Sequence, residues 1–74
     1  MNKLKQNRNK QELTQKQLAK KTGSYHQKIS DIETGKLPIR KMSIEFLDKL
    51  AITLELTNEE VLEIVRGKWL WNTN

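Results

Sequence analysis

The chain has 74 residues, with 14 Lys and Arg against 9 Asp and Glu, no Cys, and a formal net charge of +5 at pH 7. This length accommodates one domain with a small core. The lack of cysteine excludes disulfides and thiolate metal sites, and the single histidine, His26, excludes a histidine metal cluster. The sequence has no apolar run long enough to span a membrane and no secretory signal. We therefore expect a small cytoplasmic protein that needs no cofactor or metal and contacts no membrane.

The charge is unevenly distributed along the chain. Residues 1–41 carry eleven basic and three acidic side chains, whereas residues 42–74 carry three basic and six acidic ones. A basic half of this kind is expected to attract a polyanion, and nucleic acid is the leading candidate. The alternative is a solvated basic surface without a partner. The asymmetry suggests two surfaces with different functions.

The spacing of apolar residues predicts an all-α chain with five helices, at about 2–11, 15–22, 25–34, 44–55 and 58–66. No segment alternates between apolar and polar residues for long enough to favour a strand. We expect residues 1–68 to form the domain and residues 69–74 to form a C-terminal tail. The predicted core consists of Leu4, Leu13, Leu18, Ala19, Ile29, Ile32, Leu37, Ile44, Leu47, Leu50, Ala51, Leu54, Leu56, Val61, Leu62 and Val65.

Residues that begin and end helices support these boundaries. Three segments match the capping box, in which a hydroxyl and an amide or carboxylate satisfy free backbone donors reciprocally. These boxes start at Thr14, Ser24 and Thr57, and Ser43 is a fourth expected cap. The three glycines, Gly23, Gly35 and Gly67, each follow a helical pattern, as expected of residues that close helices in the left-handed conformation.

The helices at 15–22 and 25–34 are short and joined by the tight turn Gly23-Ser24. Two short helices in this arrangement predict a helix-turn-helix. The second helix of such a pair enters the DNA major groove, whereas the first crosses the backbone. This part of the chain therefore points to double-stranded DNA as a partner.

The segment from Leu13 to Gly35 resembles the Cro/C1-type (XRE-like) helix-turn-helix family of phage repressors and bacterial regulators. The matching elements are Leu13-Thr14-Gln15, Leu18-Ala19, Gly23, Ile29, Ile32-Glu33 and Gly35. The resemblance extends over about residues 4–65. It implies a five-helix, lambda-repressor-like DNA-binding domain with the helix-turn-helix at the second and third helices.

The resemblance implies that His26, Gln27 and Asp31 read bases. Independently, the helical step of 100° per residue directs Gln27 and Asp31 away from the apolar side of their helix. Gln27 suits adenine, Asp31 suits cytosine and His26 suits guanine or a phosphate. The alternatives are that Gln27 only completes the capping box of Ser24, that His26 is merely solvated, and that Asp31 pairs with Lys28.

Four further roles are implied by the resemblance. Gln15 matches a glutamine that bonds a phosphate and braces a base-reading side chain. Tyr25 matches a position that contacts the DNA backbone or a thymine methyl group. Arg8 and Glu33 match an ion pair between the first and third helices, which fixes geometry whatever its net effect on stability.

Basic side chains around the helix-turn-helix are candidates for further DNA contacts. Lys28 is expected to contact guanine or a phosphate, and we also count it among the base-reading residues. Backbone contacts are expected from Lys16, Lys36, Arg40 and Lys41, and these supply affinity and register rather than sequence choice. The alternative for each lysine is a solvated charge.

The C-terminal part carries a candidate interface. Val61, Leu62 and Val65 form a helical face that the resembled family often uses for pairing, and Trp69 and Trp71 follow close behind. Tryptophan often anchors interfaces. We expect these residues to contact a second copy or a partner protein. The alternative is that Trp69 covers the core and Trp71 is merely exposed.

Three functions compete on this basis. The first is a sequence-specific regulator of transcription, a homodimer that represses by steric occlusion. The second is a protein-binding module, such as an antitoxin or another regulator that grips a partner through its acidic half; small controllers of restriction-modification systems belong to the same size class. An enzyme is not expected, because the sequence offers no nucleophile–base pair, metal cluster or glycine-rich phosphate loop.

Overall fold

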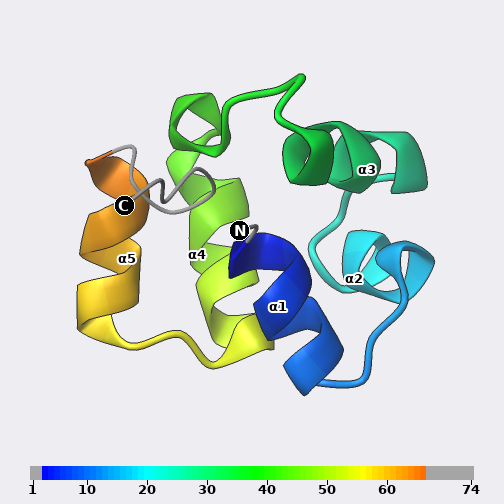
Figure 1. Cartoon of the computed structure of the whole chain (residues 1–74), viewed down its shortest axis with the longest axis horizontal. Helices are drawn as coiled ribbons and strands as arrows, with labels where there is room; N and C mark the ends of the chain where they lie inside the picture. The colour runs from blue at the N-terminus through cyan, green and yellow to red at the C-terminus, as the bar shows by residue number, and fades with distance from the viewer. Residues whose placement is uncertain (1–2, 67–74) are drawn as a thin grey trace.

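The computed structural model describes residues 3–66, which fold into helices connected by short turns, without a strand in that range (Figure 1). The elements are α1 (Lys3–Lys10), α2 (Gln15–Lys21), α3 (His26–Thr34), the 3₁₀ turn η1 (Ile39–Lys41), α4 (Ile44–Leu54) and α5 (Asn58–Val65). The predicted all-α class with five helices is confirmed. The turn η1 was not predicted. None of the helices between residues 3 and 66 has the length and apolar character needed to cross a lipid bilayer.

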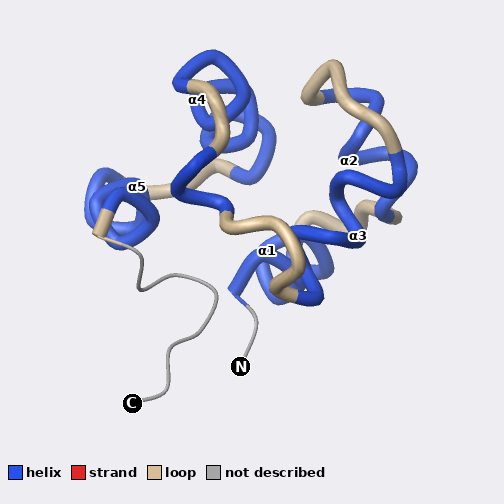
Figure 2. Tube along the Cα trace, turned by 90° about the horizontal axis from the view of Figure 1, so that it is seen from above, coloured by secondary structure: helices blue, strands red, loops and turns tan. Residues whose placement is uncertain are grey.

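The elements divide between the two ends of the molecule. Along its longest dimension of 29 Å, the α2–α3 pair lies at one end and α5 lies at the other, with α1 and α4 between them (Figures 1 and 2). α2 packs against both α3 and α4, and η1 packs against α5. An ion pair between Lys3 Nζ and Glu63 Oε1, at 2.8 Å, connects α1 to α5. The α2–α3 pair is thereby presented at the edge of the fold.

Two of the predicted capping boxes are present, and one is not. Thr14 and Thr57 each accept a hydrogen bond from the third residue of their helix, whose side chain bonds the backbone of the cap in return. Ser43 caps α4 as predicted. The prediction for Ser24 is wrong, because α3 begins one residue later with Tyr25 at its N-cap and no side-chain cap.

The reason lies in how α2 ends. The Ser24 N–H donates to the Ala19 carbonyl at 2.7 Å, and the Gly23 N–H donates to the Lys20 carbonyl at 3.3 Å. Together with the positive φ of Gly23, these two bonds form a Schellman closure. Ser24 is therefore the last residue that closes α2, and its buried hydroxyl has no hydrogen-bond partner among the described residues.

Left-handed residues end other helices as well. Gly35 closes α3 with φ 87°, as predicted, whereas Gly67 lies outside the described residues. Glu12 and Glu55 also have positive φ. At each of them, the N–H of the glutamate and the N–H of the next residue donate to carbonyls of the preceding helix in the same pattern as Gly23 and Ser24. A left-handed backbone is unfavourable for a residue with a Cβ, so these two helix ends are strained. Left-handed residues at these two positions were not predicted from the sequence.

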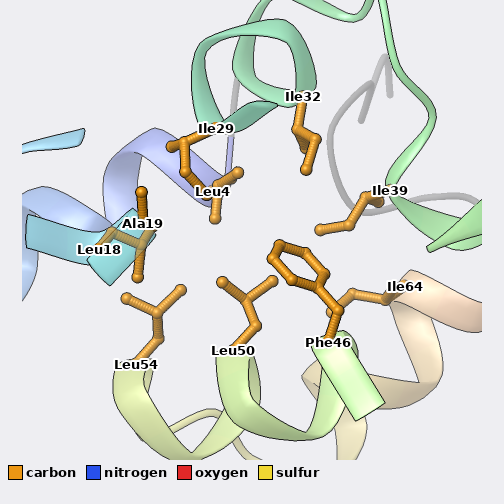
Figure 3. Close-up of a cluster of buried hydrophobic side chains, with 10 residues drawn as sticks. All are labelled: Leu4, Leu18, Ala19, Ile29, Ile32, Ile39, Phe46, Leu50, Leu54 and Ile64. Carbon is orange, nitrogen blue, oxygen red and sulfur yellow. The ribbon is translucent and has the colours of Figure 1, made fainter. Parts of the chain in front are cut away.

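The core gathers around the side of α4 that faces α1, α2 and α3 (Figure 3). Predicted core residues that are buried are Leu4, Leu18, Ala19, Ile29, Ile32, Leu50 and Leu54, and Leu13, Leu37, Leu47 and Leu56 pack partly buried against them. The buried cluster also contains Ile39, Phe46 and Ile64, which were not predicted.

Three core predictions are wrong, and all lie on α4 and α5. Ile44, Leu62 and Val65 are exposed at 85%, 48% and 64%. On α5 the buried residue is Ile64, so that helix turns a different face inward from the one predicted. On α4 the predicted Leu50 and Leu54 are buried, and Phe46 is buried in place of Ile44. Ala51 and Val61 are only partly buried.

Candidate nucleic-acid interface

α3 divides into a buried and a solvent-facing side. Ile29, Ile32 and Glu33 are buried against the rest of the fold. The opposite side carries Gln27, which is exposed, and Asp31, which is half-buried. His26, at the first position of the helix, is exposed too. The helix therefore presents polar side chains to solvent along the side that a ligand would approach.

A buried ion pair holds α3 in place from behind. Arg8 on α1 donates from Nε to Glu33 Oε2 at 2.6 Å and from Nη2 to Glu33 Oε1 at 3.3 Å. The two side chains are 10% and 5% exposed. Arg8 also donates from Nη1 to the Leu13 carbonyl at 2.8 Å, which fixes the loop before α2. A guanidinium that makes several charge-assisted bonds in this way sets geometry in addition to neutralising charge.

Hydrogen bonds continue from this ion pair to the start of α3. Gln15, the first residue of α2, donates from Nε2 to Glu33 Oε1 at 3.0 Å. His26 Nε2 lies 2.8 Å from Gln15 Oε1. We call the series Arg8–Glu33–Gln15–His26 the bracing chain. It connects α1, α2 and α3 and ends on an exposed residue that was predicted to read bases.

A second polar contact organises the exposed side of α3. Gln27 donates from Nε2 to Asp31 Oδ1, one turn later, at 2.9 Å. Two alternatives raised by the sequence therefore do not apply: Gln27 does not complete a capping box with Ser24, and the side chain of Asp31 bonds Gln27 rather than Lys28. The carboxylate steers the amide of Gln27, which retains one N–H and its carbonyl oxygen for a ligand.

Lys28 lies apart from His26 and Gln27. Its Nζ sits 4.3 Å from the centroid of the Phe46 ring, on the α4 side of α3, in a cation–π geometry. The side chain is half-buried. The structure therefore does not bring Lys28 together with the other predicted base-reading residues, and contact with a base would require its ammonium group to leave the ring.

The residues predicted to contact the DNA backbone lie at the surface around this end. Tyr25 is 66% exposed before α3, and Lys16 is exposed at the start of α2. Lys36, Arg40 and Lys41 are exposed on the connection between α3 and α4. The turn η1 organises that connection, because it buries Ile39 while leaving Arg40 and Lys41 in solvent. Pro38, the residue before η1, was the available sequence signal for this turn.

The opposite end of the molecule carries an apolar groove between α4 and α5, with a volume of about 610 Å³. Ile44 and Ile52, exposed at 85% and 69%, line it together with Val65. Asp48 and Glu55 are the charged residues of its lining. Of the predicted interface residues Val61, Leu62 and Val65, the groove lining contains Val61 and Val65 but not Leu62, and the prediction missed Ile44 and Ile52. Trp69 and Trp71, which were predicted to join this surface, lie outside the described residues.

Comparison with known proteins agrees with this geometry. A family model described as helix-turn-helix matches residues 4–61, which is most of the chain. Neither the search of curated proteins nor the search of solved structures gives a match. The match includes α1 to α4 and hence the bracing chain and the exposed side of α3. The chain therefore belongs to the Cro/C1-type (XRE-like) helix-turn-helix family of DNA-binding regulators, with a lambda-repressor-like fold.

Proposed function

We propose that this protein is a sequence-specific regulator of transcription that inserts α3 into the major groove of double-stranded DNA. The supporting observation is that the polar side of α3 is exposed and is held in place by the bracing chain. The major groove is about 12 Å wide and admits one helix. Side chains fixed in advance lose little conformational freedom on binding, so their contacts retain more of their energy.

The base-reading residues in this proposal are His26, Gln27 and Asp31. Gln27 fits adenine, because its free N–H can donate to N7 while its carbonyl accepts from the N6 amino group. Asp31 can accept from the N4 amino group of cytosine through the oxygen that Gln27 does not use. Lys28 is a weaker candidate for base contact because its ammonium group is held over Phe46.

The proposed contacts to the DNA backbone come from residues around α2, α3 and η1, all of which are exposed except the half-buried Gln15. Each cation that neutralises a phosphate releases counterions, which adds affinity without sequence preference. The candidates are Gln15, Lys16, Tyr25, Lys36, Arg40 and Lys41.

We propose further that two copies bind together and repress transcription by occluding the promoter in the cytoplasm. Two recognition helices would then meet half-sites about 34 Å apart on one face of the duplex. The apolar groove supports pairing, since it offers a hollow and protruding isoleucines on the same face, as an isologous contact requires. Burial of Ile44, Ile52 and Val65 would supply the driving force.

One observation favours a second candidate function. The charged residues that line the apolar groove are Asp48 and Glu55, both acidic, so two copies would bring like charges together there. A different protein with a basic, apolar segment would not meet this repulsion. An antitoxin, or another regulator with a protein partner, would use the groove in this way.

Selection from a pool of random duplex DNA tests the main proposal. We expect enrichment of a palindromic site. Gln27→Ala should change the preferred base at one position of each half-site, whereas Lys41→Ala should weaken binding to all duplexes and lower the salt slope by about 1. If no site is enriched at moderate salt, while the protein is monomeric and retains a copurified partner protein that Ile52→Asp releases, the second candidate replaces the first.

A further inference from the structure

The bracing chain determines which ring nitrogen of His26 is available to DNA. The carboxylate of Glu33 accepts two hydrogen bonds from Arg8. A carboxylate paired with a guanidinium accepts hydrogen bonds and has none to donate. Whatever approaches Oε1 of Glu33 must therefore be a donor.

Gln15 is the group that approaches that oxygen. Its side-chain amide has a donating nitrogen and an accepting oxygen, and the nitrogen lies 3.0 Å from Glu33 Oε1. The reverse orientation would place two accepting oxygens against each other. The ion pair thus fixes the amide orientation, and the oxygen of Gln15 must face the opposite way, toward His26.

His26 completes the sequence of constraints. Its Nε2 lies 2.8 Å from Gln15 Oε1, an atom that only accepts, so Nε2 must carry a hydrogen. In a neutral imidazole the other nitrogen, Nδ1, then holds the lone pair. His26 is exposed, and Nδ1 has no hydrogen-bond partner among residues 3–66.

We infer that His26 is a specificity-determining residue that presents Nδ1 to the major groove as a hydrogen-bond acceptor and selects a base with an exocyclic amino group. This inference rests on the proposed DNA-reading role of α3. Adenine offers N6 and cytosine offers N4 as donors in the major groove. Guanine offers only the acceptors N7 and O6, and thymine offers the acceptor O4 and a methyl group. The contact to guanine expected from the sequence is excluded for the neutral ring, since its N–H is bound by Gln15.

Gln15 is the positioning residue in this arrangement. Without its oxygen, the ring could carry its hydrogen on either nitrogen and could turn that N–H toward a base. Loss of Gln15 should therefore relax discrimination between amino-bearing bases and guanine rather than abolish binding. A role of Gln15 limited to packing or to its proposed phosphate contact would instead weaken binding to all sites equally.

The state of the ring can be measured without DNA. Because the chain contains one histidine, long-range ¹H–¹⁵N spectra of the full-length protein at pH 8 report the tautomer of His26 alone. We expect the Nε2–H form exclusively. Gln15→Met, which keeps the length and removes the amide, should produce a visible Nδ1–H fraction, whereas Gln11→Met should not. A wild-type ring with its hydrogen on Nδ1 would overturn the inference.

The consequence for DNA is tested on the site obtained by selection. His26→Ala identifies the base pair that His26 contacts, as the position where the wild-type preference disappears. Wild-type protein should prefer adenine or cytosine there by about fivefold or more over guanine and thymine at pH 8. Gln15→Met should reduce this ratio toward one while Gln11→Met retains it. A preference for guanine, or a selected site on which His26→Ala changes no position, refutes the inference alone. Failure to select any site instead refutes the proposed function, and the tautomer measurement remains valid.

Discussion

The two ends of this small fold differ in which kind of side chain has partners within the fold and which kind remains in solvent. At the α2–α3 end, charged and polar groups are withdrawn from solvent or bonded to one another, as in the pair Arg8–Glu33. At the α4–α5 end, large apolar side chains such as Ile44 and Ile52 remain in solvent. Both arrangements are costly for an isolated domain, because buried charge loses hydration and exposed apolar surface loses the benefit of burial. The first cost is offset within the fold by the hydrogen bonds of the buried pair, whereas the second is offset when the exposed apolar surface meets a partner.

This contrast supports the proposal that the two ends recognise different classes of partner. The polar end is preorganised, since its side chains already have defined hydrogen bonds in the free protein. The apolar end has no comparable polar network in its lining and depends on surface burial. Four changes test this contrast, from the largest expected effect to the smallest.

Removal of one partner from the buried ion pair should have the largest effect on stability. Arg8→Met leaves the Glu33 carboxylate buried without its guanidinium, and we expect the free energy of unfolding to fall by about 3–5 kcal/mol. Urea denaturation followed by circular dichroism measures the change. The double variant Arg8→Met/Glu33→Met removes both charges and should recover much of the loss. Equal losses in the single and double variants would show that the pair acts through packing alone.

The register of α4 and α5 is tested by one substitution at two sites. Ile64 is 1% exposed in α5, whereas Ile44 is 85% exposed in α4. Ile64→Ala should lower the free energy of unfolding by about 2–4 kcal/mol, because it leaves a cavity in the core. Ile44→Ala should change it by about 0.5 kcal/mol or less. Thermal unfolding of dilute samples compares the two, and a larger loss for Ile44→Ala would contradict the packing described for this end.

Sequence reasoning succeeded for the α2–α3 pair and failed in part for α4. The α2–α3 pair carries strong local signals, such as the capping hydroxyl of Thr14 and the left-handed Gly23, and its boundaries were predicted to within a residue. α4 instead has apolar residues on the side that faces the core and also on the side that faces solvent. Periodicity cannot decide which of these faces turns inward, so Phe46 was missed and Ile44 was misassigned.

The residues of the candidate site and part of their arrangement were predictable. The resemblance implied the Arg8–Glu33 ion pair and a bracing role for Gln15, but not that Gln15 joins Glu33 to His26. The donor and acceptor of each hydrogen bond depend on which atoms meet after folding, and the packing of α1, α2 and α3 determines which atoms meet. Ser24 failed for a related reason: its spacing to Gln27 satisfies the capping pattern, yet the closure of α2 already uses its backbone.

Charge placed in the apolar groove should separate the functions of the two ends. Ile52→Asp introduces a carboxylate at an exposed position that contributes little to the core, so folding should be retained. We expect a monomer in light scattering and a loss of about tenfold or more in affinity for a palindromic duplex, because the second copy no longer adds its contacts. Binding to a duplex with one half-site should be unchanged.

Asn9→Asp adds the same charge at an exposed position of α1 and serves as the control. It should leave the dimer intact. If Ile52→Asp remains dimeric, the second copy does not occupy the groove.

The smallest expected effect on stability concerns the left-handed residues that close α2 and α4. α2 closes with Gly23 at φ 70°, whereas α4 closes with Glu55 at φ 54°. Glu55→Gly should raise the free energy of unfolding by about 0.5–1 kcal/mol, since glycine adopts this conformation without a steric penalty. Glu45→Gly is the matched control in the same helix, where the backbone is right-handed, and it should lower stability by about 0.5–1 kcal/mol.

Gly23→Ala is the reciprocal change at the other end. A Cβ built there meets only Lys49 Nζ, at 3.6 Å, which is an ordinary contact, so its cost comes from the backbone and should be about 1 kcal/mol. Chemical denaturation at several salt concentrations measures all three variants. If Glu55→Gly gives no gain, the carboxylate contributes an interaction that compensates for its strained backbone. If Glu55→Gly does raise stability, Glu55 is retained at a cost to the fold, and because it lines the apolar groove, that result would favour a role for its carboxylate toward a basic partner at this surface.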